Sequence, residues 1–100
     1  MRVISLKTLR EFWRGHRDAE QALRQWYKTA VRAAWRSLRD VRQTYPHADG
    51  VASAGGGVLT VFNICGNRYR LIARVCYDYQ LINIRAVLTH EEYNRRDWKE

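Results

Sequence analysis

The stretch from Val58 to Leu88 constrains the fold most, because it holds three β-type runs separated by two short polar breaks. The runs read VLTVFNI, RYRLIARVCY and LINIRAVL, and the breaks read CGN and DYQ. Runs of this length that are rich in β-branched and aromatic residues predict strands. The breaks are too short for a crossover helix, so we predict two tight hairpin turns. The chain is therefore expected to build an antiparallel β-meander.

Arginines interrupt these strands, and their positions predict a basic face. Alternation along the second strand puts Arg68, Arg70 and Arg74 on one side, and Arg85 on the third strand is expected beside them. The third strand alternates between Ile82, Ile84, Ala86 and Leu88 on one face and Asn83, Arg85 and Val87 on the other. A charge buried without a partner costs on the order of several kcal/mol. We therefore expect the face with the four arginines to be open to solvent.

The N-terminal half predicts an edge strand followed by two helices. Residues 1–5 are β-branched and apolar, and the first helix follows them, capped by Ser5 or Thr8 and ended by Gly15. Asp18 is a good N-cap for a second helix that runs to about Ser37. The apolar positions at helical spacing are Leu6, Leu9, Trp13, Ala19, Leu23, Trp26, Ala30 and Ala33. We expect Trp13 and Trp26 to be core residues.

A basic ladder recurs every four residues along the second helix, at Glu20, Arg24, Lys28, Arg32 and Arg36. Two interpretations stay open. The ladder is a solvated face in which Glu20 and Arg24 pair across one turn, or it is a docking surface for RNA or an acidic partner.

The regular pattern fails between Leu38 and Gly57. The only proline, Pro46, stops any helix, and the three glycines that end the stretch give the backbone its greatest freedom. We expect this part of the chain to be mobile, either as a hairpin or as a loop on the substrate side.

Length and charge narrow the class of protein. One hundred residues predict one domain over residues 1–100, and the net charge of +8 indicates an anionic partner. Arginine outnumbers lysine fifteen to three, which favours phosphate or carboxylate, since a guanidinium binds either with two parallel hydrogen bonds. No apolar run approaches the ~20 residues of a membrane span, and charges interrupt the N-terminus. We expect a cytosolic protein with no membrane association, with Cys65 and Cys76 as reduced thiols and no metal site.

The third strand leads into a short final helix that carries the candidate catalytic groups. Thr89 is expected to cap this helix, with Glu92 at the capping-box position. His90 and Tyr93 are three residues apart, so they fall on the same side of the helix.

These residues also carry a resemblance to a known family. The motif consists of Phe62-Asn63, Gly66-Asn67, Arg70-Leu71 and Thr89-His90-Glu91-Glu92-Tyr93. Together with the segments VISLKTLREFW, WYKTA and DVRQTYPHAD, it resembles the HigB family of bacterial toxins, within the RelE-like superfamily, over nearly the whole chain. The chain departs from the family pattern at the three-glycine loop and at Asn94, where an aspartate is usual.

The resemblance implies an α+β, RelE-like fold, in which an N-terminal strand and two helices pack on one face of the meander and a short helix follows. It implies the toxin of a type II toxin–antitoxin pair, a cytoplasmic mRNA interferase that uses no cofactor and cuts mRNA in the ribosomal A site. It also implies a helix-turn-helix (HigA-like) antitoxin, through which alone the toxin would reach promoter DNA.

Metal-free RNA cleavage uses the substrate's own 2′-OH as the nucleophile, and it needs a base, an acid and cations. An imidazole titrates near neutrality, so His90 is the candidate base or acid, while Tyr93 donates a proton or stacks on a base. Arg70 and Arg68 are expected to hold the scissile phosphate. The remaining candidates for RNA binding are Arg74, Arg85, Asn63 and Asn67.

Plainer interpretations stand beside these. His90 is equally a cap or a surface residue, Tyr93 packs the final helix on the sheet, and Arg74 covers the sheet with its aliphatic stem. A non-catalytic RNA- or ribosome-binding protein would use the same arginines without His90 or Tyr93. A pure interaction module would use the basic surface to bind an acidic peptide.

Overall fold

The predicted meander lies at the centre of the structure, a computed structural model that describes residues 1–98. Its strands are β3 (Val58–Ile64), β4 (Tyr69–Cys76) and β5 (Leu81–Thr89), and each pairs antiparallel with the next. The turn after β3 places Cys65 and Gly66 at φ 55° and 66°, the left-handed conformation that tight turns require. Both predicted hairpins are confirmed.

Two further strands complete a five-stranded sheet in the order β1-β5-β4-β3-β2. β1 (Arg2–Ile4) is the predicted edge strand, and it runs parallel to β5, so the sheet is mixed. β2 (Asp49–Ala52) pairs antiparallel with β3 and lies in the stretch that we predicted to be irregular. A hairpin loop joins β2 to β3 through the three glycines. Gly56 and Gly57 adopt φ 101° and 75° there, which side chains other than glycine rarely tolerate.

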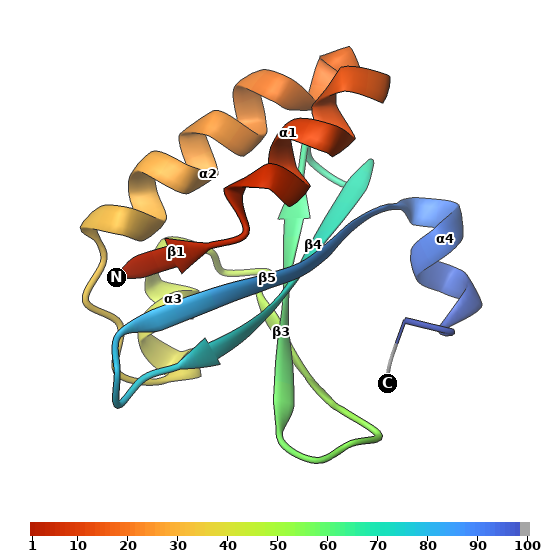
Figure 1. The fold of residues 1–100 in the computed structure, drawn as a ribbon. Coiled ribbons are helices and arrows are strands. Elements are labelled where there is room, and N and C mark those ends of the chain that lie inside the picture. The colour runs from red at the N-terminus through yellow and green to blue at the C-terminus, as the bar shows by residue number, and fades with distance from the viewer. Residues whose placement is uncertain (99–100) are drawn as a thin grey trace.

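Two helices cover one face of the sheet, as predicted (Figure 1). α1 (Leu6–Gly15) is followed by the short 3₁₀ helix η1 (Arg17–Ala19) and by α2 (Glu20–Arg32). α2 ends five residues earlier than expected, because Ala33 takes an extended conformation. The prediction that Asp18 caps α2 is wrong: Ala19 is the N-cap residue, and the Asp18 carboxylate accepts hydrogen bonds from Arg68 and Tyr69 of the sheet instead.

A third helix, α3 (Leu38–Thr44), corrects the prediction that residues 38–57 are irregular. The Ser37 side chain caps it by accepting a hydrogen bond from the Asp40 backbone N–H at 3.3 Å. Its seven residues bury one side chain, Val41. Such a short helix shows no apolar periodicity, which is why the sequence pattern did not reveal it.

The main core lies between the helices and the sheet. Trp13 and Trp26 are buried in it, as predicted, and Trp26 meets the Phe62 ring edge-on at a centroid separation of 5.3 Å. Other buried members include Leu9, Leu23, Trp35, Leu71, Ile82, Ile84 and Val87. Within residues 1–98, no helix is long and apolar enough to cross a lipid bilayer. Both cysteines carry free thiols.

The opposite face of the sheet is not open, so this prediction is wrong. Leu59, Val61 and Ile72 form a second buried cluster there. Val51 and Leu88, from other strands of the sheet, pack beside the cluster. Tyr93 and Trp98 also pack against it, so the segment around α4 (His90–Arg95) covers this face. The segment that follows β5 thus supplies the apolar cover that alternation along the strands cannot reveal.

A β-bulge changes which residues of β5 face the helices. Ile72 of β4 lies opposite Ala86, whereas Ala73 lies opposite Ile84, so Arg85 is the extra residue. The alternation of β5 therefore slips by one position. Val87 joins the helix-side core and Leu88 joins the second cluster, the reverse of the prediction for this end of the strand.

Candidate active site

The candidate active site is centred on Arg70. This residue is only 8% exposed although its side chain carries a positive charge. The turn before β4 fixes its guanidinium. One terminal nitrogen donates to the Asn67 carbonyl at 3.1 Å and to the Tyr69 carbonyl at 3.2 Å. The other donates to the Asn67 side-chain oxygen. Asn67, which was predicted as an RNA-binding candidate, thus holds the Arg70 guanidinium through both its backbone and its side chain.

α4 brings His90 and Tyr93 to the same place. The predicted capping box is confirmed: Thr89 accepts from the Glu92 N–H at 3.2 Å, and Glu92 accepts from the Thr89 N–H at 2.9 Å. The His90 backbone N–H also donates to the Arg68 carbonyl at 3.1 Å. The start of α4 is therefore attached to the same turn that fixes Arg70.

Arg70, His90 and Tyr93 meet in space. The second terminal nitrogen of Arg70 lies 3.4 Å from His90 Nδ1, and the guanidinium carbon lies 5.2 Å from the centre of the Tyr93 ring. Because a guanidinium only donates, this contact requires Nδ1 to accept. Neutral His90 then carries its proton on Nε2, and the residue is exposed, so a substrate can reach that nitrogen.

Among residues 1–98, the charge of Arg70 has no acidic partner. The ion pairs among residues 1–98 involve other cations, and the contacts of Arg70 are to carbonyl oxygens, an amide, an imidazole and a ring. Buried charges in proteins are normally paired. A fixed, largely buried guanidinium without a carboxylate is therefore suited to an anion such as a phosphate.

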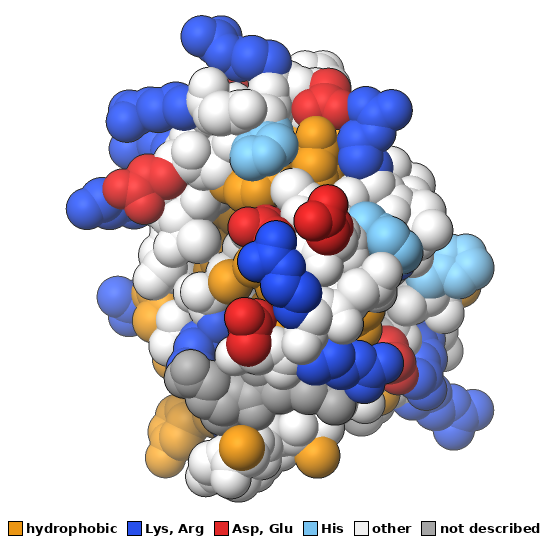
Figure 2. Space-filling view, turned by 90° about the vertical axis from the view of Figure 1, so that its right-hand side faces the viewer, with side chains coloured by type: hydrophobic (Ala, Val, Ile, Leu, Met, Phe, Trp, Pro, Cys, Tyr) orange, Lys and Arg blue, Asp and Glu red, His pale blue; other side chains and the backbone are white. Residues whose placement is uncertain are grey.

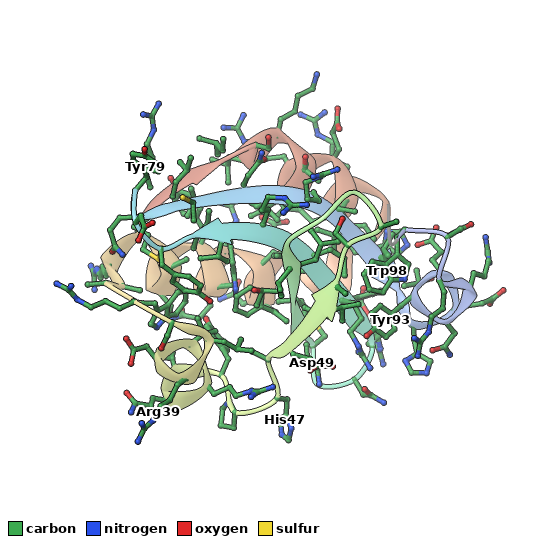
Figure 3. All side chains as sticks on the ribbon, turned by 90° about the horizontal axis from the view of Figure 1, so that it is seen from below. Arg39, His47, Asp49, Tyr79, Tyr93 and Trp98 are labelled. Carbon is green, nitrogen blue, oxygen red and sulfur yellow. The ribbon has the colours of Figure 1, made fainter. Side chains whose placement is uncertain are left out.

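An aromatic stack supports Tyr93 from behind. The Trp98 ring stacks on the Tyr93 ring with centroids 4.9 Å apart, and its indole N–H donates to the Tyr93 carbonyl at 2.7 Å. Figure 3 shows both side chains between α4 and the sheet. With Arg70 on one side and Trp98 on the other, the Tyr93 ring has little free surface for stacking on a base, and its hydroxyl is the group left for chemistry. Sequence reasoning missed Trp98, because nothing in its spacing links it to Tyr93.

Asn63 lies beside the group formed by Arg70, His90 and Tyr93, whereas the Arg68 side chain lies away from it. Asn63 lies directly opposite Arg70 in the β3–β4 ladder, so the two side chains share one face of the sheet. Arg68 precedes β4 and lies in the turn, so strand alternation does not apply to it. Its guanidinium pairs with Asp18 on the helix side of the sheet.

The hydrogen bonds of Asp18 shift the pKa values of Asp18 and of Tyr69. Hydrogen bonds from Tyr69 at 2.7 Å and from Arg68 lower the pKa of the Asp18 carboxyl below its ordinary value of 3.8. The same hydrogen bond to Asp18 is the main cause that raises the pKa of the Tyr69 hydroxyl. This cluster thus fixes the turn from the helix side, while Arg70 faces the other way.

Arg74 and Arg85 also lie apart from the candidate active site. Arg74 reaches the glycine loop and donates to the Gly56 carbonyl at 3.3 Å, and a side chain at Gly57 would collide with it. Arg85 occupies the β-bulge and lines a shallow hollow with residues that include Phe12 of α1 and His16, which follows the helix. The four arginines therefore do not form the common face that we expected.

The surface around α4 carries both signs of charge. Figure 2 shows acidic and basic side chains interspersed on this end of the molecule. Glu91 and Arg95 form one such pair at 3.8 Å, on the exposed side of α4. In the part of the chain that the structure describes, no three His, Cys, Asp or Glu side chains are grouped so that they could hold a metal ion.

Fold and site together define a small α+β protein in which a fixed, largely buried guanidinium lies beside an exposed imidazole. Its family follows from comparison with known proteins: the family model for HigB_toxin, the RelE-like toxic component of a toxin-antitoxin system, matches residues 19–96. The chain belongs to this family. No curated protein matches the chain. Every predicted site residue lies within the matched range, whereas Trp98 lies just beyond it.

Membership makes the chain a toxin of a toxin–antitoxin system, and such a toxin has a cognate antitoxin as its partner. The family also indicates an RNase activity in general terms. The α+β architecture, with five strands and a short C-terminal helix, agrees with the predicted RelE-like fold.

Proposed function

We propose that this toxin is a metal-independent endoribonuclease that cleaves mRNA on the translating ribosome. The observation that carries the proposal is Arg70, a nearly buried guanidinium that contacts an exposed imidazole and a tyrosine ring and has no carboxylate partner among residues 1–98. A protein that only held RNA by its charge would not need to bury an arginine next to two groups that can exchange protons.

The proposed chemistry assigns one task to each group. The 2′-OH oxygen of the substrate bonds to the adjacent phosphorus, and the bond from phosphorus to the 5′ oxygen of the next nucleotide breaks. The 2′-OH loses a proton and the leaving 5′ oxygen gains one, and we assign these transfers to His90 and Tyr93. Arg70 neutralises the charge that develops on the phosphorane oxygens. The products are a 2′,3′-cyclic phosphate and a 5′-hydroxyl end.

Preorganisation is the main physical support for this assignment. Electrostatic catalysis depends on charges that are fixed before the reaction, so that no reorganisation is needed in the transition state. Asn67 fixes Arg70, and the capping box together with the Arg68 carbonyl fixes the start of α4. Asn63, across the ladder from Arg70, is placed to contact the ribose or base beside the bound phosphate.

The ribosome is the proposed setting for two reasons. The resemblance to HigB toxins implies cleavage in the A site, and a net charge of +8 favours approach to ribosomal RNA. Arg74 and Arg85 lie away from the Arg70 group, and we assign them to binding of RNA outside the cleavage site.

The test is mRNA cleavage in a translating bacterial extract, with 5′ ends mapped by primer extension. Wild type, Arg70→Ala and His90→Ala are compared, with His47→Ala as the matched control, since His47 is an exposed histidine far from α4 (Figure 3). We expect cuts at codon positions of translated message, retained in His47→Ala and reduced by about 10² or more in the other two variants. Translation that stops while the message stays intact would instead identify a non-catalytic ribosome-binding protein.

A further inference from the structure

A groove between α1 and α2 remains without a role in the proposed cleavage. It has a volume of about 410 Å³ and is lined by Leu6, Arg10, Trp13, Arg24, Tyr27 and Lys28. The first helix contributes half of these residues and the second helix the other half. The two helices that line the groove cover one face of the sheet (Figure 1). Tyr93 and Trp98 pack against the cluster on the opposite face.

The groove combines an apolar floor with a basic rim. Leu6, Trp13 and Tyr27 all pack against the main core and close the bottom. Among the described residues, each of the three charged side chains that line it is basic. Lys28 also borders a second hollow that contains Arg32, so the basic row of α2 continues past the groove. Arg24, Lys28 and Arg32 belong to the ladder that the sequence left open between a solvated face and a docking surface, whereas its last member, Arg36, lies beyond the end of α2.

We infer that this groove binds an acidic segment of the cognate antitoxin, with an apolar side chain of that segment on the floor. The inference rests on the toxin–antitoxin family, not on the cleavage chemistry. Carboxylates of the partner would pair with Arg10 and Lys28, because both are exposed. Lys28 and Arg32 lie four positions apart on α2, about one turn, so two acidic residues four apart on a partner helix would match them.

The same residues disfavour RNA as the occupant. RNA binding without base pairing relies on aromatic faces on which bases stack. Here the Arg24 guanidinium lies 4.6 Å from the centre of the Trp13 ring, and Trp13 is only 9% exposed. Arg24 is in addition paired with Glu20 at 2.8 Å. The Trp13 ring, covered by Arg24 and largely buried, thus offers no open face to a base.

The test uses the toxin and the protein encoded by the reading frame next to its gene. The groove variant, Arg10→Glu/Lys28→Glu, reverses the charge at two positions of the groove rim. The control variant, Arg36→Glu/Arg39→Glu, makes the same change of charge at exposed positions around the start of α3. Binding is measured by isothermal titration calorimetry in an Arg70→Ala background, and mRNA cleavage is measured separately in the translating extract with Arg70 intact. Circular dichroism checks that both double variants fold.

We expect the groove variant to lose about tenfold or more in antitoxin affinity, the control to stay within about twofold, and both to cleave mRNA. Equal loss in the two variants would show non-specific attraction and overturn the inference. Unchanged binding in the groove variant, or loss of cleavage together with binding, would overturn it as well. Absence of cleavage by the wild type concerns only the proposed nuclease activity, because antitoxin binding is read independently.

Discussion

Arg68 and Arg70 lie two positions apart in one hairpin, yet they differ in burial and in whether a carboxylate pairs with their charge. The Arg68 side chain is 65% exposed and has a carboxylate partner, Asp18. Arg70 is 8% exposed and has none among residues 1–98. If stability alone shaped the hairpin, the buried arginine would be the one with the acidic partner. The difference supports the proposal that the charge of Arg70 is kept for a ligand, whereas Arg68 holds the turn through its pair with Asp18.

The largest expected effect comes from removing the charge of Arg70. Arg70→Ala should lower mRNA cleavage by about 10²–10³, because the phosphorane would lose its fixed cation. Arg68→Ala, with the same change of charge, should lower it by less than about threefold, since only an exposed ion pair is lost. Rates are compared in the translating extract. Similar losses in the two variants would mean that cleavage depends on overall charge and not on the site.

Removing only the hydroxyl of Tyr93 tests whether this group transfers a proton during cleavage. Tyr93→Phe keeps the stack on Trp98 and the contact with Arg70, so the protein should unfold at an unchanged urea concentration. Cleavage should fall by about 10-fold to 10²-fold if the hydroxyl transfers a proton. An unchanged rate would leave Tyr93 with a packing role and would assign proton transfer to His90 alone.

Trp98 should act through Tyr93, and its effect should be smaller. Trp98→Ala removes the ring stacked on Tyr93 and part of the cover over the second cluster, so we expect cleavage to fall by about tenfold. Trp98→Phe keeps a stacked ring, and it should recover most of the rate although it lacks the N–H. The readout that separates positioning from folding is the rate per folded molecule, with the folded fraction measured by circular dichroism: kcat corrected for this fraction should fall while KM stays nearly constant. A loss that appears only as a lower population of folded protein would contradict this role.

Part of this arrangement was predictable from sequence because it is local. The turn at Cys65–Arg68, the capping box of Thr89 and Glu92, and the placement of His90 with Tyr93 all depend on residues within four positions of each other. The motif that resembles HigB toxins then linked this helix to Arg70, and the structure brings these side chains together.

The predictions that were wrong concern contacts between distant parts of the chain. The bulge at Arg85 shifts the alternation of β5 by one residue, and the sequence has no glycine or proline there to mark it. Asp18 looked like a helix cap, yet its partners lie about 50 positions away in the sheet. Trp98 covers a cluster built by β3 and β4. No pattern in a single segment can reveal these contacts, because each depends on how the segments are arranged in space.

The smallest expected effect is that of Asp18→Asn, which removes the charge paired with Arg68. Its effect on the free energy of unfolding should depend on pH. The folded state lowers the pKa of Asp18 below 3.8, so the charged carboxylate stabilises the protein above that pH. This contribution should be complete near neutral pH and be lost as the pH falls through the lowered pKa. Asp18→Asn keeps an oxygen that accepts from Tyr69 but removes the charge. The gap in the free energy of unfolding between wild type and Asp18→Asn should therefore shrink from pH 6 to about pH 3.

Urea unfolding of both proteins across that pH range measures the gap, and salt provides the second control. Arg68 and Asp18 are largely exposed, so screening should reduce the gap at neutral pH. Cleavage by Asp18→Asn should stay close to wild type, because Asn67 and the Tyr69 carbonyl still hold Arg70. A gap that stays constant with pH would show that Asp18 acts through its hydrogen bonds and not through its charge. A large loss of cleavage would instead mean that the two arginines are coupled through the turn, and the contrast between them would then no longer separate structure from function.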